Sequence, residues 1–109
     1  MSFAKTPTPP YYAVIFTSKR TEVEEKEYGI VADRMVALAR EQPGFLGVES
    51  AREEQGIGIT VSYWSSLDAT KQWKKNAEHQ MAQEKGKRDW YESFVTRISK
   101  VERDYTFKC

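Results

Sequence analysis

The stretch GITVSYWSSLDATKQW, residues Gly58–Trp73, changes from the pattern of a strand to that of a helix and decides the fold. Apolar side chains alternate with small or polar ones up to Trp64, which is the period of a half-buried strand. Ser65 stands three residues before Asp68, a spacing typical of a helix N-cap with a carboxylate in the first turn. From Leu67 onward the apolar spacing becomes helical. The stretch therefore predicts a strand that leads directly into a helix.

The remaining segments complete a ferredoxin-like α+β fold with a four-stranded antiparallel sheet. The first strand is apolar on both faces, so we expect cover on both sides of it. The first helix stops before Pro43, because a residue before proline is pushed out of the helical region. We expect a break in the helical sequence near Asn76–Ala77 and a register change near Ser99–Lys100 in an unusually long last strand. The predicted elements are strands at Tyr11–Ser18, Phe45–Arg52, Ile57–Trp64 and Tyr91–Phe107, a helix at Tyr28–Gln42, and helical stretches at Leu67–Asn76 and Glu78–Lys85.

Length and composition limit the class of protein. The 109 residues suit one domain, here residues 11–109, preceded by a proline-containing extended arm at residues 1–10. A net charge of +1 gives no support for nucleic-acid binding, and no apolar run reaches the ~18 residues of a membrane helix. The single cysteine, Cys109, and the lack of a signal-peptide pattern predict a cytoplasmic protein. One histidine and one cysteine cannot build an ordinary metal site, and no dinucleotide fingerprint is present.

Several short sequence motifs resemble those of the antibiotic biosynthesis monooxygenase (ABM) family. The resemblance implies a dimeric α+β barrel, in which two sheets pack face to face and the helices stay outside. Each subunit of such a homodimer keeps a pocket between its helices and its sheet. The motifs that resemble the family are Gly44–Phe45, Gly47–Ser50, Val61–Trp64, Trp73–Lys74, Ala77–His79, Trp90–Tyr91 and Val101–Arg103.

The resemblance also implies a reaction. Some family members oxidise aromatic phenols with O₂ and without metal or flavin, so we expect a cofactor-independent monooxygenase for a small aromatic or quinone-like substrate. His79 and Trp73 are the catalytic candidates. His79 is the chain's one imidazole and could take the phenol proton, provided that the expected break turns it toward Trp73.

Five further side chains are expected to bind the substrate. The aromatic ones offer an apolar body, and the tyrosines add a polar tip. An inward-pointing arginine would need an anionic ligand or a carboxylate partner, for which Glu49 is the candidate. Core packing is the competing interpretation of the tryptophans. The expected binding residues are Trp64, Tyr63, Tyr91, Tyr12 and Arg97.

Two other functions stay open. A non-catalytic dimer could bind a small ligand in the same pocket. A related branch of the family degrades haem, using an asparagine on the first strand and a histidine ten residues after the helix tryptophan. Here Gln83 stands ten residues after Trp73, and the first strand ends Phe16–Thr17–Ser18 without asparagine. The sequence therefore disfavours haem.

Overall fold

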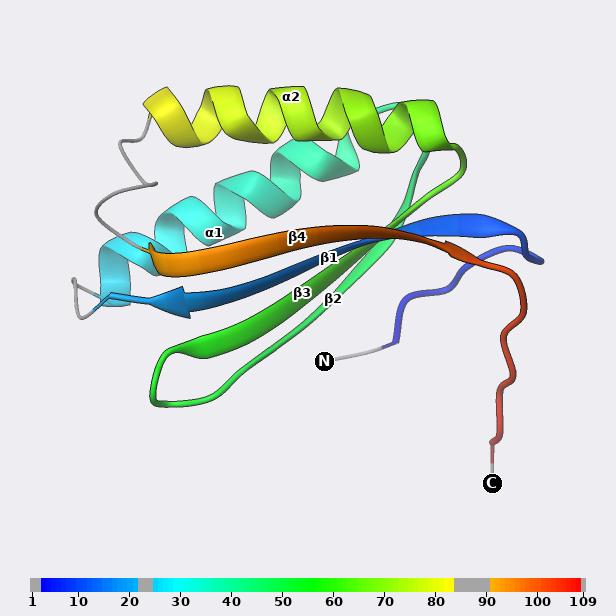
Figure 1. Ribbon diagram of the computed structural model, residues 1–109, viewed down its shortest axis with the longest axis horizontal. Helices are drawn as coiled ribbons and strands as arrows, with labels where there is room; N and C mark the ends of the chain where they lie inside the picture. Colours follow the sequence, from blue (N-terminus) through cyan, green and yellow to red (C-terminus); the bar gives the residue numbers. More distant parts are fainter. Residues whose placement is uncertain (1–2, 22–24, 84–90, 109) are drawn as a thin grey trace.

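A four-stranded antiparallel sheet with two helices on one face forms the protein (Figure 1). The structure is a computed structural model, and it describes residues 3–21, 25–83 and 91–108. The strands lie in the order β2-β3-β1-β4, which confirms the predicted ferredoxin-like fold. No helix in these ranges is long and apolar enough to cross a membrane. The elements are β1 at Tyr11–Arg20, α1 at Glu25–Arg40, β2 at Phe45–Arg52, β3 at Ile57–Trp64, α2 at Leu67–Gln83 and β4 at Tyr91–Val101.

Helix α2 runs without interruption, so the expected break near Asn76–Ala77 is wrong. Neither glycine nor proline interrupts this part of the helix, and alanine and glutamate favour it. The Asn76 amide donates to Gln42 Oε1 at 2.7 Å instead of competing with the helix backbone. The N-cap is also one residue later than predicted, because Ser66 Oγ accepts from the Ala69 N–H at 3.1 Å.

The last strand is shorter than predicted. Val101 pairs with Tyr11, the first residue of β1, so β4 ends where its partner begins. Residues 102–108 continue beyond the sheet. The expected irregularity near Ser99–Lys100 is wrong, since the register holds there and shifts at Lys19/Arg20 instead. The predicted end of the helical stretch Glu78–Lys85 lies outside the described residues.

Strand register assigns side chains to two faces, because residues directly opposite in antiparallel strands point the same way. Val14 lies opposite Ser62 on β3 and Ile98 on β4. This face carries the helices, and its core cluster consists of Val14, Ala39, Trp64 and Ala69. We call the opposite side of the sheet, which carries no helix, the open face. On β1 it includes Tyr11 and Ala13, both about 4% exposed.

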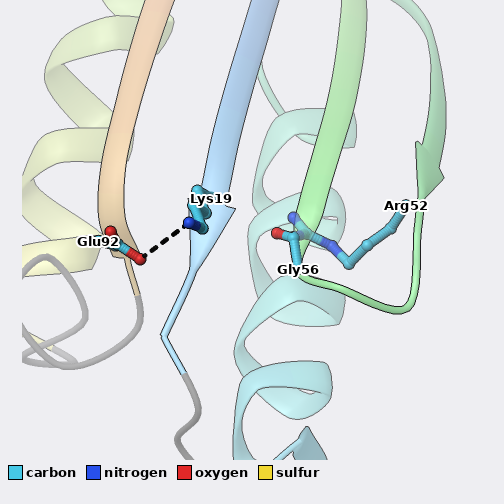
Figure 2. Close-up of polar contacts among 4 residues, drawn as sticks. All are labelled: Lys19, Arg52, Gly56 and Glu92. Atoms are coloured by element: carbon cyan, nitrogen blue, oxygen red, sulfur yellow. Dashed lines mark hydrogen bonds and ion pairs between the residues drawn. The ribbon is translucent and has the colours of Figure 1, made fainter.

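Side-chain contacts tie the strands together at the hairpin end of the sheet (Figure 2). Lys19 Nζ on β1 lies 3.5 Å from Glu92 Oε2 on β4. Arg52 donates to the Gly56 carbonyl at 2.8 Å and to Ser18 Oγ at 3.2 Å. The Arg52 guanidinium also lies over Gly58, where an added Cβ would come within 2.6 Å of it. These contacts fix the register far from the tryptophan pair.

Candidate functional site

The two tryptophans of the deciding stretch stack on each other on the helix-bearing face, at the end of the sheet where β3 leads into α2. Their ring centroids lie 5.6 Å apart with an interplanar angle of 24°. Trp64 is 0% exposed, meets Phe45 edge-on at 5.5 Å, and donates its indole N–H to Ser62 Oγ at 2.8 Å. Trp64 is therefore core rather than pocket wall. Trp73 is half-buried on α2 and keeps part of its ring available.

A group of apolar side chains on β1 and β4 is incompletely covered on the same face. Helix α2 packs over β1 and β3, while Phe94 and Ile98 of β4 stay 38% and 45% exposed. The three rings at this place pack together, with centroid distances of 5.4 Å for Phe16–Tyr91, 5.2 Å for Phe16–Phe94 and 5.8 Å for Tyr91–Phe94. We call Phe16, Tyr91, Phe94 and Ile98 the aromatic shelf.

Tyr12 completes the row of side chains between the tryptophan pair and β4. It lies opposite Trp64 on one side and Lys100 on the other, and it is half-buried. The helix-bearing face thus carries four of the predicted site residues, with Tyr12 opposite Trp64 at one end of β1 and Tyr91 opposite Arg20 at the other. The four residues are Tyr12, Trp64, Trp73 and Tyr91. Trp64 is fully buried, so surface for an aromatic ring comes from Tyr12, Trp73 and Tyr91, whose tyrosine hydroxyls add polar groups.

Tyr63 and Arg97 lie on the open face instead. Successive strand residues point to opposite faces, so Tyr63 and Trp64 cannot share a pocket. Arg97 lies opposite Ile15 and is exposed. The Tyr63 hydroxyl donates to Glu49 Oε1 at 2.6 Å, so Glu49 serves Tyr63 rather than Arg97. Burial, together with this hydrogen bond, raises the pKa of Tyr63 above the ordinary phenol range.

His79 is exposed on α2. It follows Trp73 by six residues on an unbroken helix. Six residues at 3.6 per turn rotate it by about 120° from Trp73. Because α2 has no break between Trp73 and His79, the backbone does not turn His79 toward Trp73 as predicted.

A separate hollow lies between the end of α1 and the start of α2. It has a volume of about 500 Å³ and is lined by Gln42, Pro43, Gly44, Ser65, Ser66, Asp68, Ala69, Gln72 and Asn76. None of the predicted site residues lines it. The lining includes three side-chain amides and two hydroxyls, and none of its residues is aromatic. No group of three histidine, cysteine, aspartate or glutamate side chains suited to a metal occurs in the described part of the chain.

Phe16 and the apolar face of β4 were not predicted as site residues. The sequence did carry a signal for them, because Phe94 and Ile98 share one face of the last strand. What it did not reveal was that Phe16 of β1 packs against that face.

Comparison with known proteins identifies the family. The family model described as antibiotic biosynthesis monooxygenase matches residues 11–85, and the chain belongs to this family. The uncharacterized protein YqjZ of Bacillus subtilis (strain 168) is 57% identical over 105 residues, covering 96% of this chain and 91% of that protein.

Solved structures of distant sequence share the fold. PA3566 from Pseudomonas aeruginosa has a TM-score of 0.67 at 15% identity, covering 91% of this chain and 99% of its own. SnoaB, a cofactor-independent oxygenase from Streptomyces nogalater, has a TM-score of 0.66 at 15% identity, covering 90% of this chain and 97% of its own. At these identities the likeness concerns the fold.

Proposed function

We propose that the protein is a cofactor-independent monooxygenase that oxidises a small aromatic substrate held between Trp73 and the aromatic shelf. The observation that carries this proposal is the packed cluster of three rings left partly exposed on the helix-bearing face. Membership of the antibiotic biosynthesis monooxygenase family and the fold shared with SnoaB support an oxygenase rather than another enzyme class.

The proposed reaction converts a phenol and O₂ into a quinone and water. One oxygen atom replaces the hydrogen on a ring carbon and becomes a carbonyl, and the other leaves as water. The substrate supplies all four electrons, so the equation balances without a further reductant. The protein's part is to hold the ring flat against the shelf, limit water near it and orient the reacting carbon.

Loss of the phenol proton makes the ring electron-rich, and a general base for this step is typically worth ~10²–10⁴-fold in rate. The role of His79 as that base stays a prediction, and its exposed position does not favour it. We therefore expect His79→Ala to keep turnover within about threefold, whereas a loss in the range typical of a general base would assign the step to His79. Tyr12 and Tyr91 are half-buried tyrosines of the helix-bearing face, and we propose their hydroxyls as the polar groups that orient the substrate.

We further propose that the protein works as a homodimer in the cytoplasm. The open face exposes Ile57, Ile59 and Val95 at 47%, 45% and 40%, and a second copy would cover them. Sheet-to-sheet contacts of this kind bury on the order of 2,000 Å² or more in obligate dimers. A single cysteine in 109 residues fits a reducing compartment.

A non-catalytic ligand-binding dimer is the second candidate, and the exposure of His79 favours it. An oxygen electrode separates the two functions. Purified protein is mixed with a panel of phenols and naphthols, and O₂ uptake is followed beside ligand binding. Trp73→Ala should lower both signals, while Ile30→Ala, a change at an exposed site on α1, should leave both unchanged. Binding without O₂ uptake would favour the second candidate.

A further inference from the structure

A lysine and a tyrosine lie opposite each other at one end of the helix-bearing face. Lys100 on β4 is the register partner of Tyr12 on β1. Side chains of such a cross-strand pair point to the same face of the sheet, with their Cβ atoms about 4.5–5.5 Å apart. We call Tyr12 and Lys100 the polar pair. An ammonium group and a phenol hydroxyl are both hydrogen-bond donors, so the pair can donate to one acceptor between them.

The polar pair adjoins the tryptophan stack on one side and the aromatic shelf on the other. Tyr12 lies opposite Trp64, on which the half-buried ring of Trp73 stacks. Lys100 stands two residues from Ile98 of the shelf, so their Cα atoms are about 7 Å apart along the strand. The aliphatic stem of a lysine can lie along such an apolar neighbour while its charged head stays at the rim. The proposed aromatic site therefore has one cationic end.

The charge of this end is not neutralised by a neighbouring carboxylate. Lys100 is exposed, and its ammonium forms no ion pair or hydrogen bond with any residue that the structure describes. Glu102, two residues further along the chain, lines a hollow beside the N-terminal arm. On α2, Lys74 and Glu78 lie 3.7 Å apart and offset each other. Arg20 lies at the opposite end of β1. The Lys100 ammonium is therefore available to an anionic ligand.

We propose that the polar pair holds the oxygen of a phenolic substrate as its phenolate, with the substrate's rings directed toward Ile98 and the rest of the aromatic shelf. An ordinary phenol has a pKa of about 10 and is mostly neutral at pH 7, but a cation within ~4–6 Å favours its ionised form. The phenol proton is released to water, and Lys100 and Tyr12 stabilise the anion that remains. No general base of the protein is then required, which agrees with the exposed position of His79. The inference rests on the proposed function and adds the charge of the substrate and the residue that selects it.

The ionisation of a bound phenol tests the polar pair. The probe is umbelliferone, a hydroxycoumarin whose phenol and phenolate forms absorb at different wavelengths. It is titrated with base in buffer and again in the presence of saturating full-chain protein. The pKa of the bound probe should lie about one unit below that of the free probe, which corresponds to about tenfold tighter binding of the phenolate than of the phenol. Added salt should reduce this difference, because the pair lies at the surface.

Lys100→Met removes the charge and keeps an unbranched apolar side chain. The bound probe should then ionise within about 0.3 pKa units of the free probe, since the favourable charge is gone. Tyr12→Phe should reduce the shift only in part, because the charge remains. The matched control is Lys75→Met, an exposed position on α2 that is rotated by about 200° from Trp73, and it should leave the shift unchanged. Coumarin, which lacks the hydroxyl, should bind equally well to native protein and Lys100→Met, a result that a merely structural role of Lys100 would not give.

Three results overturn the inference, and they separate it from the proposed function. A bound probe that ionises like the free one means that the site takes neutral phenols, and the proposed oxygenase still stands. A lowered pKa that persists in Lys100→Met shows that another group stabilises the anion, and again only the role of the polar pair is lost. If neither coumarin nor umbelliferone binds the native protein, the proposed aromatic site itself is contradicted, and the inference fails with it.

Discussion

Replacing Trp73 by alanine separates a packing role from a ligand-binding role. A fully buried tryptophan costs about 3–5 kcal/mol when truncated to alanine. Trp73 is half-buried and stacks on Trp64 at 5.6 Å, so we expect a loss of about 2–3 kcal/mol in the free energy of unfolding, of which about 0.5–1.5 kcal/mol is the ring stack. Trp64→Ala should cost more, because Trp64 is 0% exposed.

Urea unfolding followed by circular dichroism measures these losses. Native protein, both single variants and the double variant are compared at one protein concentration, since a dimer's stability depends on concentration. The double-mutant cycle isolates the stacking energy between Trp64 and Trp73. A loss below about 0.5 kcal/mol in Trp73→Ala, the range of ordinary surface changes, would refute the reasoning. A coupling energy near zero would refute only the stabilising contact between the Trp64 and Trp73 rings, and not the packing role of Trp73.

Three further predictions concern packing and ionisation. Gly44→Ala should destabilise by about 1–3 kcal/mol, because Gly44 has a φ of 85° and the new Cβ would lie 2.7 Å from that of a buried alanine on α2. Its control, Gly29→Ala, meets nothing within 4 Å and should stabilise α1 by about 0.5–1 kcal/mol in the same unfolding assay. Ser62→Ala should cost about 1–3 kcal/mol by leaving the buried Trp64 indole N–H without its acceptor; an unchanged urea midpoint would argue against that bond. The raised pKa of Tyr63 stabilises the fold fully below about pH 10, the unfolded value, and this contribution is lost as pH rises through the folded value. The stability difference between native protein and Tyr63→Phe should therefore be constant from pH 7 to 9 and shrink above pH 10.

Local patterns were sufficient to predict the sheet and the element order. The predicted bounds of β2 and β3 are the observed ones, because alternation and the polar turn between them are short-range signals. The length of β4 was overestimated, since only its partner strand decides where pairing stops. Val101 ends β4 because Tyr11 begins β1. The sequence of the tail has strand character but no partner within the chain's own sheet.

The candidate site was harder to predict than the fold. Tyr63 and Trp64 are neighbours in one strand, so their side chains point to opposite faces of the sheet, although both were predicted to line one pocket. The predicted catalytic role of His79 depended on a break in α2. The structure has a continuous helix there, in which Asn76 donates to Gln42, and no local sequence pattern identifies that long-range pair. Phe16 contacts Phe94 across 78 residues of sequence, a pairing that only strand register defines. The roles of Trp73 and of the other proposed site residues stay predictions.

Oxygen uptake with isotope-labelled O₂ tests the central claim most directly. Purified protein is given ¹⁸O₂ and a phenol that binds it, and product and water are analysed by mass spectrometry. We expect one ¹⁸O in the quinone and one in water for each O₂ consumed, with turnover strongly reduced in Trp73→Ala and unchanged in Ile30→Ala. Tight binding of the phenol at the aromatic shelf with no O₂ consumption would contradict the proposed oxygenase function.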